Sequence, residues 1–131
     1  MKKLISILLS ALMFTGCVGT GNHQTNTYRS ITMDEAVTMM EKERGYIILD
    51  VRRPDEFAAG HIPNAINIPN ESIGTDEISS LSDKDQLIMV YCRSGRRSKE
   101  ASEKLIKLGY TNIVEFGGIL DWKGEIAVEK E

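Results

Sequence analysis

Apolar and polar residues follow two distinct patterns along this chain. Short apolar runs predict buried β-strands, at residues 46–51, 65–68, 87–91 and 112–116. Apolar residues spaced three or four apart predict helices that bury one face, at 33–44, 54–59, 96–108 and 119–122. Residues 71–81 leave helix and loop both open. Strands that alternate with helices predict an α/β fold, in which a small, mainly parallel sheet carries helices on both faces.

Residues with strong local preferences mark where these helices begin and end. Thr32 and Glu35 form a capping box, in which each side chain accepts a hydrogen bond from the other residue's backbone amide. Pro54 suits the first position of a helix, because its fixed φ angle and missing N–H cost little there. Gly60 and Gly109 each follow a predicted helix and are expected to end it.

The amino terminus has the layout of a secretion signal. Two lysines precede an apolar stretch that is too short for a permanent membrane-spanning helix, and small residues lead from it to Cys17. The sequence Phe-Thr-Gly-Cys resembles the lipobox of bacterial lipoproteins, although Phe14 stands where that family usually has Leu. This resemblance implies that Cys17 carries lipid. The predicted parts are a signal peptide at 1–16, a lipidated cysteine and flexible tether at 17–28, and a domain at 29–131.

An exported, lipidated protein has consequences for its cysteines and partners. The lipid would hold the domain on the bacterial cell envelope, at the outer leaflet of the cytoplasmic membrane or at the outer membrane. Cys92 would then be the remaining thiol, and no internal disulfide could form. Because exported proteins usually pair their cysteines, such a thiol is either an inert core residue or a working group. The net charge is −3, and basic residues gather only near Cys92 and at 52–53, so nucleic acid is not an expected partner.

Cys92 carries the strongest chemical signal, because it lies between a predicted strand and a predicted helix. Free backbone N–H groups and the helix dipole favour an anion at that position. Arg93, Arg96 and Arg97 add positive charge. These surroundings favour the thiolate, which is the nucleophilic form of cysteine. We therefore expect an exposed, oxidation-sensitive nucleophile, since a buried structural thiol would not explain the cationic loop.

Four segments of the chain carry recognisable motifs. They are Leu-Asp-Val-Arg at 49–52 with Glu-Phe at 56–57, Gly-His-Ile-Pro-Asn-Ala-Ile-Asn-Ile-Pro at 60–69, Val-Tyr-Cys-Arg-Ser-Gly-Arg-Arg-Ser at 90–98 with Ala101, and Gly-Gly at 117–118 with Trp122. In order and spacing they resemble the rhodanese family of sulfurtransferases, in its single-domain form, across about residues 30–125. Asn64 stands where that family commonly has Gly, and Asn tolerates the left-handed backbone almost as well.

The resemblance implies a specific reaction at Cys92. Its sulfur attacks the outer sulfur of a small anionic donor such as thiosulfate, becomes a persulfide, and passes that sulfur to a thiol or to cyanide. Residues 93–97 form the substrate-binding loop and wrap backbone N–H groups around the persulfide as a nest. No metal or other cofactor is implied, and we expect a monomer.

Within that loop each residue has an expected role. Arg97 is expected to face the anionic end of the donor and to keep the thiolate ionised, with a solvated arginine in the first helical turn as the alternative. Arg93 and Arg96 either steer anionic donors or remain solvated surface charges. Ser94 and Gly95 serve the backbone of the loop, and Gly95 permits a conformation that a side chain would forbid.

Three residues outside the loop are expected to support the site. Asp50 is predicted to be a structural acid that hydrogen-bonds to backbone near the loop, and Arg52 is predicted to pair with Glu56. We expect His61 to pack and to hydrogen-bond rather than to act as a general base, because transfer from a preformed thiolate needs no strong base. No set of residues has the spacing of a metal site.

Other functions on a similar fold have to be weighed against sulfur transfer. Cell-cycle dual-specificity phosphatases resemble rhodaneses but place an arginine six positions after the cysteine, where this chain has Ser98. Arg97 is five positions after Cys92, which is the sulfurtransferase form. The alternative function is a persulfide carrier, or thiol-reactive binding module, that serves a protein partner and turns over little free thiosulfate. The presence of Cys92 disfavours an inactive interaction domain.

Overall fold

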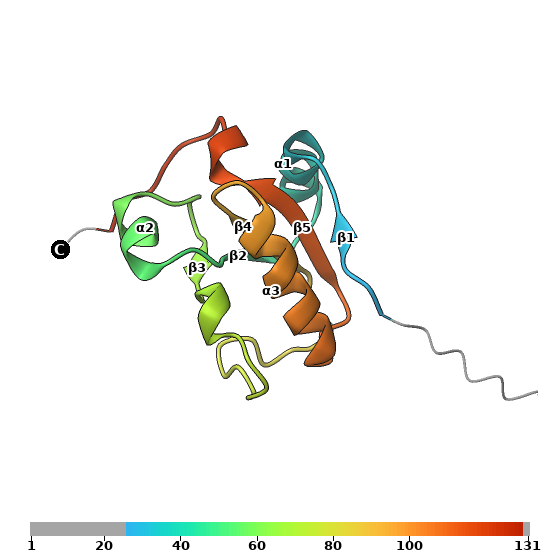
Figure 1. The fold of residues 1–131 in the computed structure, drawn as a ribbon. Coiled ribbons are helices and arrows are strands. Elements are labelled where there is room, and N and C mark those ends of the chain that lie inside the picture. The colour runs from blue at the N-terminus through green and yellow to red at the C-terminus, as the bar shows by residue number, and fades with distance from the viewer. Residues whose placement is uncertain (1–25, 130–131) are drawn as a thin grey trace, which may run out of the picture.

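The structure is a computed structural model that describes residues 26–129. The predicted signal peptide, Cys17 and most of the predicted tether lie outside the described residues. A five-stranded sheet lies at the centre, in the order β1-β5-β4-β2-β3, and each neighbouring pair of strands runs parallel (Figure 1). The strands are β1 (Arg29–Ser30), β2 (Ile47–Asp50), β3 (Ile66–Asn67), β4 (Ile88–Cys92) and β5 (Ile113–Gly118).

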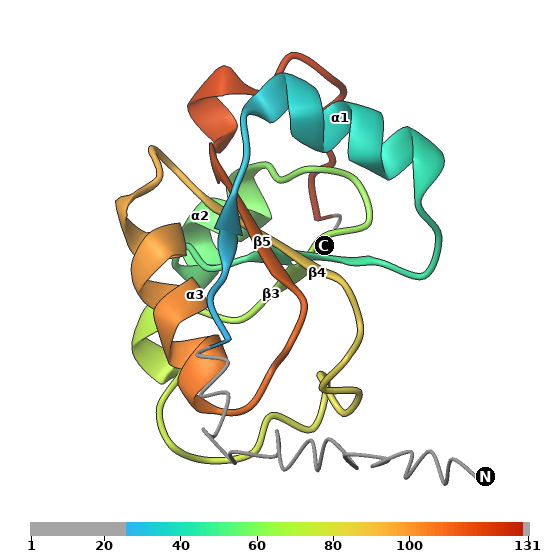
Figure 2. The same cartoon turned by 90° about the vertical axis from the view of Figure 1, so that its right-hand side faces the viewer.

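Helices cover both faces of this sheet. They are α1 (Met33–Lys42), α2 (Pro54–Ala59) and α3 (Arg96–Lys107), with single 3₁₀ turns η1 (Asn70–Ser72) and η2 (Ile119–Asp121). One core layer lies between the sheet and α3, and a second lies between the sheet and α1 with α2. Figure 2 shows α1 and α3 on opposite sides of the strands. The predicted parallel α/β fold with helices on both faces is therefore confirmed.

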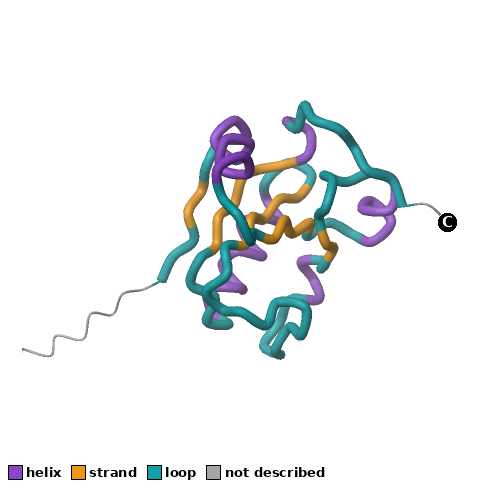
Figure 3. Tube along the Cα trace, turned by 180° about the vertical axis from the view of Figure 1, so that it is seen from behind, coloured by secondary structure: helices purple, strands orange, loops and turns teal. Residues whose placement is uncertain are grey.

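Local sequence signals account for most element boundaries. Glu35 N–H donates to Thr32 Oγ1 over 3.1 Å, and Thr32 N–H donates back to the Glu35 carboxylate, so the capping box at α1 is confirmed. Pro54 is the first residue of α2, as predicted. The hydrophobic pattern does not predict β1, because both of its residues are exposed. Residues 73–87, which include most of the ambiguous segment, contain neither helix nor strand (Figure 3).

The alternation of side chains along β4 decides where the cysteine points. Ile88, Val90 and Cys92 belong to the core layer beneath α3, whereas Met89 and Tyr91 belong to the opposite layer. Cys92 is also the last residue of this central strand. The thiol therefore lies at the carboxyl end of the parallel sheet, the edge at which ligands bind in such folds.

Three observations hold for residues 26–129 as a whole. No helix in this part of the chain has the length and apolar character that crossing a membrane requires. Within the same residues, no group of three or more His, Cys, Asp or Glu side chains is arranged to hold a metal ion. Every buried side-chain nitrogen and oxygen that the structure describes has a hydrogen-bond partner.

Candidate active site at Cys92

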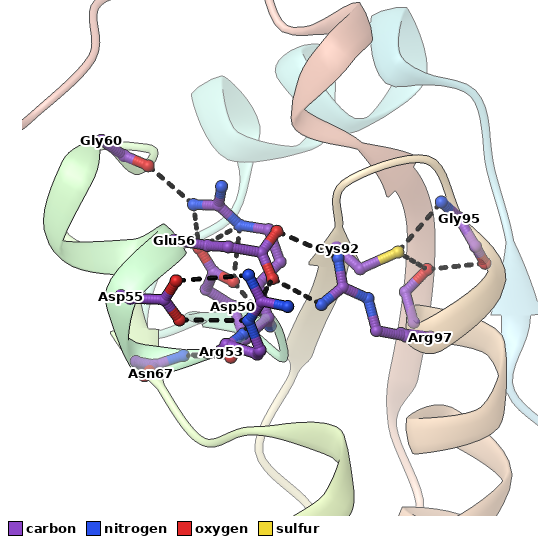
Figure 4. A network of polar contacts seen from close by, with 11 residues as sticks. Asp50, Arg53, Asp55, Glu56, Gly60, Asn67, Cys92, Gly95 and Arg97 are labelled. Atoms are coloured by element: carbon purple, nitrogen blue, oxygen red, sulfur yellow. Dashed lines mark hydrogen bonds and ion pairs between the residues drawn. The ribbon is translucent and has the colours of Figure 1, made fainter.

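The sulfur of Cys92 is enclosed by the loop that follows it (Figure 4). Gly95 N–H donates a hydrogen bond to Sγ over 2.9 Å, and Ser98 Oγ lies 3.4 Å from Sγ. Cys92 is 1% exposed and forms part of the hydrophobic core. The prediction of an exposed thiol is therefore wrong for this conformation. The cause is the alternation along β4, which turns the side chain inward beneath the first turn of α3.

The backbone of Gly95 brings an amide to the sulfur. Its φ angle of +113° lies in the left-handed region that L side chains rarely adopt, and it is the residue immediately before α3. The expected need for glycine at this position is confirmed. Among the residues that the structure describes, Gly95 provides the one backbone amide within hydrogen-bond distance of Sγ. The predicted nest of amides is therefore only partly formed around the free thiol.

The end of β5 lies directly against the same loop. The β4–β5 register shifts between Val90 and Cys92, so that Cys92 pairs with Gly118. Leu120 N–H, just beyond β5, donates to the Arg93 carbonyl over 3.3 Å. A Cβ atom at Gly118 would overlap the backbone of Arg93. Glycine at this position is therefore what allows the loop after Cys92 to lie against β5.

An open hollow lies beside the loop, at the beginnings of α2 and α3. It is lined by four arginines, two glutamates and one serine, namely Arg53, Glu56, Glu71, Arg93, Ser94, Arg96 and Arg97. Four of the five predicted loop residues thus line the hollow, whereas the fifth, Gly95, contacts the sulfur. Cys92 is not among the lining residues. The excess of arginine over glutamate makes this hollow attractive to small anions.

Arg97 forms an ion pair with Glu56 of α2 (Figure 4). Its Nη1 lies 2.7 Å from Glu56 Oε1, and its Nη2 lies 3.1 Å from Oε2. The hydrogen bonds from Arg97 are the main reason that the pKa of Glu56 is lowered from 4.5 to about 2. The pKa of Arg97 is raised, chiefly by Glu56 and to a lesser extent by the negative charge of Cys92. The hydrogen-bonding fork of Arg97 is thus already occupied by Glu56 rather than free to bind the anionic end of a donor.

Replacing Glu56 with Gln is expected to destabilise the domain by about 1–2 kcal/mol at neutral pH, because two charge-assisted hydrogen bonds are weakened. The folded-state pKa of Glu56 is lowered, so its contribution to stability is complete above its ordinary pKa of 4.5 and is lost as the pH falls toward 2. The difference in Tm between wild type and variant should shrink over that interval. Glu71→Gln, which alters another acid lining the hollow, is the control. A Tm difference that does not change with pH would contradict this assignment.

Arg52 pairs with Asp50 and not with Glu56, so the predicted Arg52–Glu56 pair is wrong. Arg52 Nη2 lies 2.7 Å from Asp50 Oδ2 and 2.7 Å from the carbonyl oxygen of Gly60. Glu56 instead binds Arg97 from α3 and lies 3.6 Å from Nε of Arg53. The Asp50 carboxylate accepts hydrogen bonds from the backbone and side chain of Arg52. Arg52 thus links Asp50 at the end of β2 to Gly60 at the end of α2, and the Asp50 side chain does not make the expected contact with backbone near the Cys92 loop.

His61 lies in a packed position outside the arginine-lined hollow. Its ring stacks on Phe57 with 3.8 Å between ring centroids, and its Nδ1 lies 2.9 Å from the Phe57 carbonyl oxygen. The His61 backbone exchanges two hydrogen bonds with Ala127 near the end of the described chain. His61 is buried and does not line the hollow. His61 therefore packs and hydrogen-bonds, as predicted from the sequence, and is not placed to act as a general base.

Two buried polar residues, Glu115 and Ser98, lie behind the sulfur. Sequence reasoning does not identify Glu115, and it uses Ser98 only to argue against a phosphatase. Their side-chain oxygens lie 2.7 Å apart, and both residues are buried. The available signal is that Glu115 is a charged residue inside the apolar run of β5. A carboxylate at such a position requires hydrogen-bond partners, which a strand pattern alone does not reveal.

Comparison with known proteins decides the family. The family model described as "Rhodanese-like domain" matches residues 32–125, which is most of the chain. This protein belongs to the rhodanese family. The resemblance noted in the sequence motifs is thereby confirmed for the domain, while the lipoprotein signal stays a prediction.

Relatives and solved structures of the rhodanese family agree with this assignment. The rhodanese domain is 37% identical over 73 residues to "Thiosulfate sulfurtransferase PspE" of Escherichia coli K12, a match that covers 56% of this chain and 70% of that protein. A rhodanese-like domain protein from Staphylococcus aureus is 33% identical with a TM-score of 0.68, covering 78% of this chain and 99% of that one. A structure titled "rhodanese with anions from E. coli" is 32% identical with a TM-score of 0.59, covering 64% and 99%.

Proposed function

We propose that this rhodanese domain moves sulfane sulfur from an anionic donor such as thiosulfate to a thiophilic acceptor through a persulfide on Cys92. The observation that carries the proposal is the position of Cys92 Sγ, which receives the Gly95 amide beneath the start of α3, beside an arginine-lined hollow. The relative named thiosulfate sulfurtransferase and the related structure named for its anions support the choice of donor.

The proposed reaction consists of two displacements at one sulfur atom. The Cys92 thiolate attacks the outer sulfur of thiosulfate, the S–S bond of the donor breaks, and sulfite leaves with the bonding electron pair. Cyanide or an acceptor thiolate then attacks the outer sulfur of the persulfide. The bond to Sγ breaks, the Cys92 thiolate is regenerated, and thiocyanate or a new persulfide leaves. Such a covalent intermediate gives ping-pong kinetics.

The three loop arginines differ in whether they already have an ion-pair partner. Arg97 is held by Glu56 and Arg96 pairs with the exposed Glu100 over 3.0 Å, whereas Arg93 makes no ion pair within residues 26–129. Arg93 is therefore the cation that is free to meet the anionic end of the donor. Arg96 and Arg97 raise the positive potential of the hollow without giving up their partners.

The enclosure of the thiol gives a specific reason to keep the second candidate function. With Cys92 only 1% exposed, the loop at 93–97 has to shift before any donor sulfur reaches Sγ. A protein partner that opens this loop on docking would make the domain a persulfide carrier with little turnover of free thiosulfate. Both functions use the same Cys92 persulfide, and they differ in what opens the loop.

Cyanide-dependent thiocyanate formation from thiosulfate tests the proposed function, together with mass spectrometry of the thiosulfate-treated protein. Rapid turnover supports the sulfurtransferase. A stable gain of one sulfur atom on Cys92 with negligible turnover supports the carrier. No added sulfur, or sulfur added at another residue, contradicts both functions.

We also propose that lipid on Cys17 anchors the protein to the cell envelope, on the strength of the leader sequence alone. Expressed as the full chain in a bacterium, Cys17→Ser is expected to move the protein from the membrane fraction to the soluble fraction, because its lipid attachment is lost. Cys92→Ser, which removes the other cysteine, is the matched control and should stay with the membranes. Unchanged membrane association of Cys17→Ser would contradict lipid anchoring.

A further inference from the structure

A carboxylate behind the active-site sulfur has no part in the reaction described so far. Glu115 of β5 is 2% exposed. Its Oε1 accepts hydrogen bonds from Ser98 Oγ over 2.7 Å and from Gly117 N–H over 2.8 Å, and Ser30 Oγ donates to Oε2 over 3.0 Å. No Lys, Arg or His among residues 26–129 lies within ion-pair distance of it. Burying a carboxylate among neutral donors alone costs folding free energy, which suggests that Glu115 has a functional role.

Ser98 connects this carboxylate to the sulfur. Its hydroxyl oxygen lies 2.7 Å from Glu115 Oε1 and 3.4 Å from Cys92 Sγ, and the side chain is fully buried. A hydroxyl group has one hydrogen, and the acceptors within reach of Ser98 are Glu115 Oε1 at 2.7 Å, the Gly95 carbonyl oxygen at 2.9 Å, the Gly117 carbonyl oxygen at 3.4 Å and the sulfur. Glu115 Oε1 is the nearest of them. While the hydrogen is directed to Glu115, a lone pair of the same oxygen is free to accept the S–H hydrogen of Cys92.

We propose that Glu115 accepts the proton of Cys92 through the Ser98 hydroxyl when the thiol becomes a thiolate. The S–H bond breaks as its proton passes to Ser98 Oγ, and the Ser98 hydroxyl proton passes to Glu115 Oε1. The negative charge moves from the carboxylate to the sulfur, and no proton leaves the protein. This inference rests on the proposed function, because it explains how an enclosed thiol becomes the nucleophile of that reaction.

The surroundings of the two ends suit this exchange. On the sulfur side, the Gly95 amide and the charge of Arg97 face the thiolate. On the carboxylate side, Lys99 of α3 and Glu115 Oε1 both lie within 4 Å of the space that a Cβ at Gly95 would fill, and Tyr28, ahead of β1, lies within the field of Glu115. Lys99 is the cation of α3 nearest to this space. The Gly95 amide and Arg97 compensate the charge once it moves to the sulfur.

Glu115→Gln tests the relay, because it keeps the shape of the side chain but removes the proton acceptor. The readout is alkylation of Cys92 by iodoacetamide, under conditions where the rate is proportional to reagent. In the wild type, the Cys92–Glu115 pair shares one proton, so the rate should be nearly flat around neutral pH. In Glu115→Gln the proton has to leave for solvent, so the rate should rise roughly tenfold per pH unit. Parallel pH profiles for the two proteins would overturn the proposal.

Two variants of Ser98 form a matched pair for the same experiment. Ser98→Ala breaks the relay and should give the pH profile of Glu115→Gln, whereas Ser98→Thr keeps a hydroxyl and should keep the wild-type profile. The double variant Ser98→Ala with Glu115→Gln should react like either single variant, because the two residues act as one unit. Separate structural roles would instead give effects that add, and that result overturns the relay.

These experiments distinguish a failure of the proton relay from a failure of the proposed sulfur transfer. Alkylation requires the thiolate and an opening of the loop at 93–97 but no sulfur donor, so the pH profiles can be read even if thiosulfate never forms a persulfide on Cys92. Absence of a persulfide refutes sulfur transfer and leaves the alkylation result standing. If Glu115→Gln does not fold, the contrast between Ser98→Ala and Ser98→Thr decides the question. Cys92→Ser provides the blank, which measures any alkylation at Cys17.

Discussion

Cys92→Ser is expected to reduce thiocyanate formation at least about a thousandfold, because a serine hydroxyl cannot carry the transferred sulfur as a persulfide. Sγ is the atom that receives the Gly95 amide, and in the part of the chain that the structure describes Cys92 is the one cysteine. The measurement is the rate of thiocyanate formation from thiosulfate and cyanide. Mass spectrometry should show that the gain of one sulfur atom is also lost.

Two controls separate loss of the nucleophile from loss of the fold. The substituted oxygen occupies nearly the place of the sulfur, so the Tm of Cys92→Ser should stay close to that of the wild type. Cys17→Ser removes the other cysteine of the chain and should keep its activity as a purified protein. Substantial turnover by Cys92→Ser would show that another group receives the sulfur, and it would refute the proposed mechanism.

Gly118→Ala is expected to damage both stability and sulfur transfer. The added methyl group would overlap the backbone of Arg93 and Ser94, and backbone atoms cannot rotate out of the way as a flexible side chain can. Overpacking of this kind costs about 1–3 kcal/mol or more, so the Tm should fall clearly. Because the loop would shift relative to Cys92, sulfur transfer should fall roughly a hundredfold, which is the typical cost of displacing a catalytic group by about an ångström.

Gly74→Ala is the matched control for this substitution. A Cβ at Gly74 meets no atom within 4 Å, so the change should alter the free energy of unfolding by less than about 0.5 kcal/mol. Urea denaturation and the thiocyanate assay can be run on both variants side by side. If Gly118→Ala unfolds like Gly74→Ala and keeps full activity, β5 does not hold the loop in the way that the structure indicates.

The hydrophobic pattern predicts most of the fold because most elements have strong and local signals. The apolar run at 87–91 becomes β4, and Pro54 begins α2. By contrast, β1 consists of two exposed residues, and its pairing is set by β5, whose paired residues lie 85 positions further along the chain (Arg29 with Val114), so no local pattern identifies it. The family motifs likewise identify Cys92 and its loop, because those residues are contiguous in the sequence.

The rest of the site depends on distances between segments, which spacing along the chain does not give. Arg97 and Glu56 are 41 positions apart, and the pair forms because α2 and α3 both begin at the edge of the sheet where the parallel strands β2 and β4 end. Arg52 binds Asp50, which lies two positions before it at the end of β2. Glu115 and Ser98 meet only because β5 lies beneath α3. The motif gives the residue type at position 92 but not the direction of its side chain, which the pleat of β4 decides.

The enclosure of the Cys92 sulfur by the loop at 93–97 affects how long the protein stays active. Peroxide has to take the same path as the donor, so irreversible overoxidation to the sulfinic or sulfonic acid should proceed only as often as the loop moves aside. At the proposed location outside the reducing cytoplasm, this enclosure would slow the oxidative loss of the active thiol. The rate at which peroxide inactivates the protein therefore reports how often the loop at 93–97 opens.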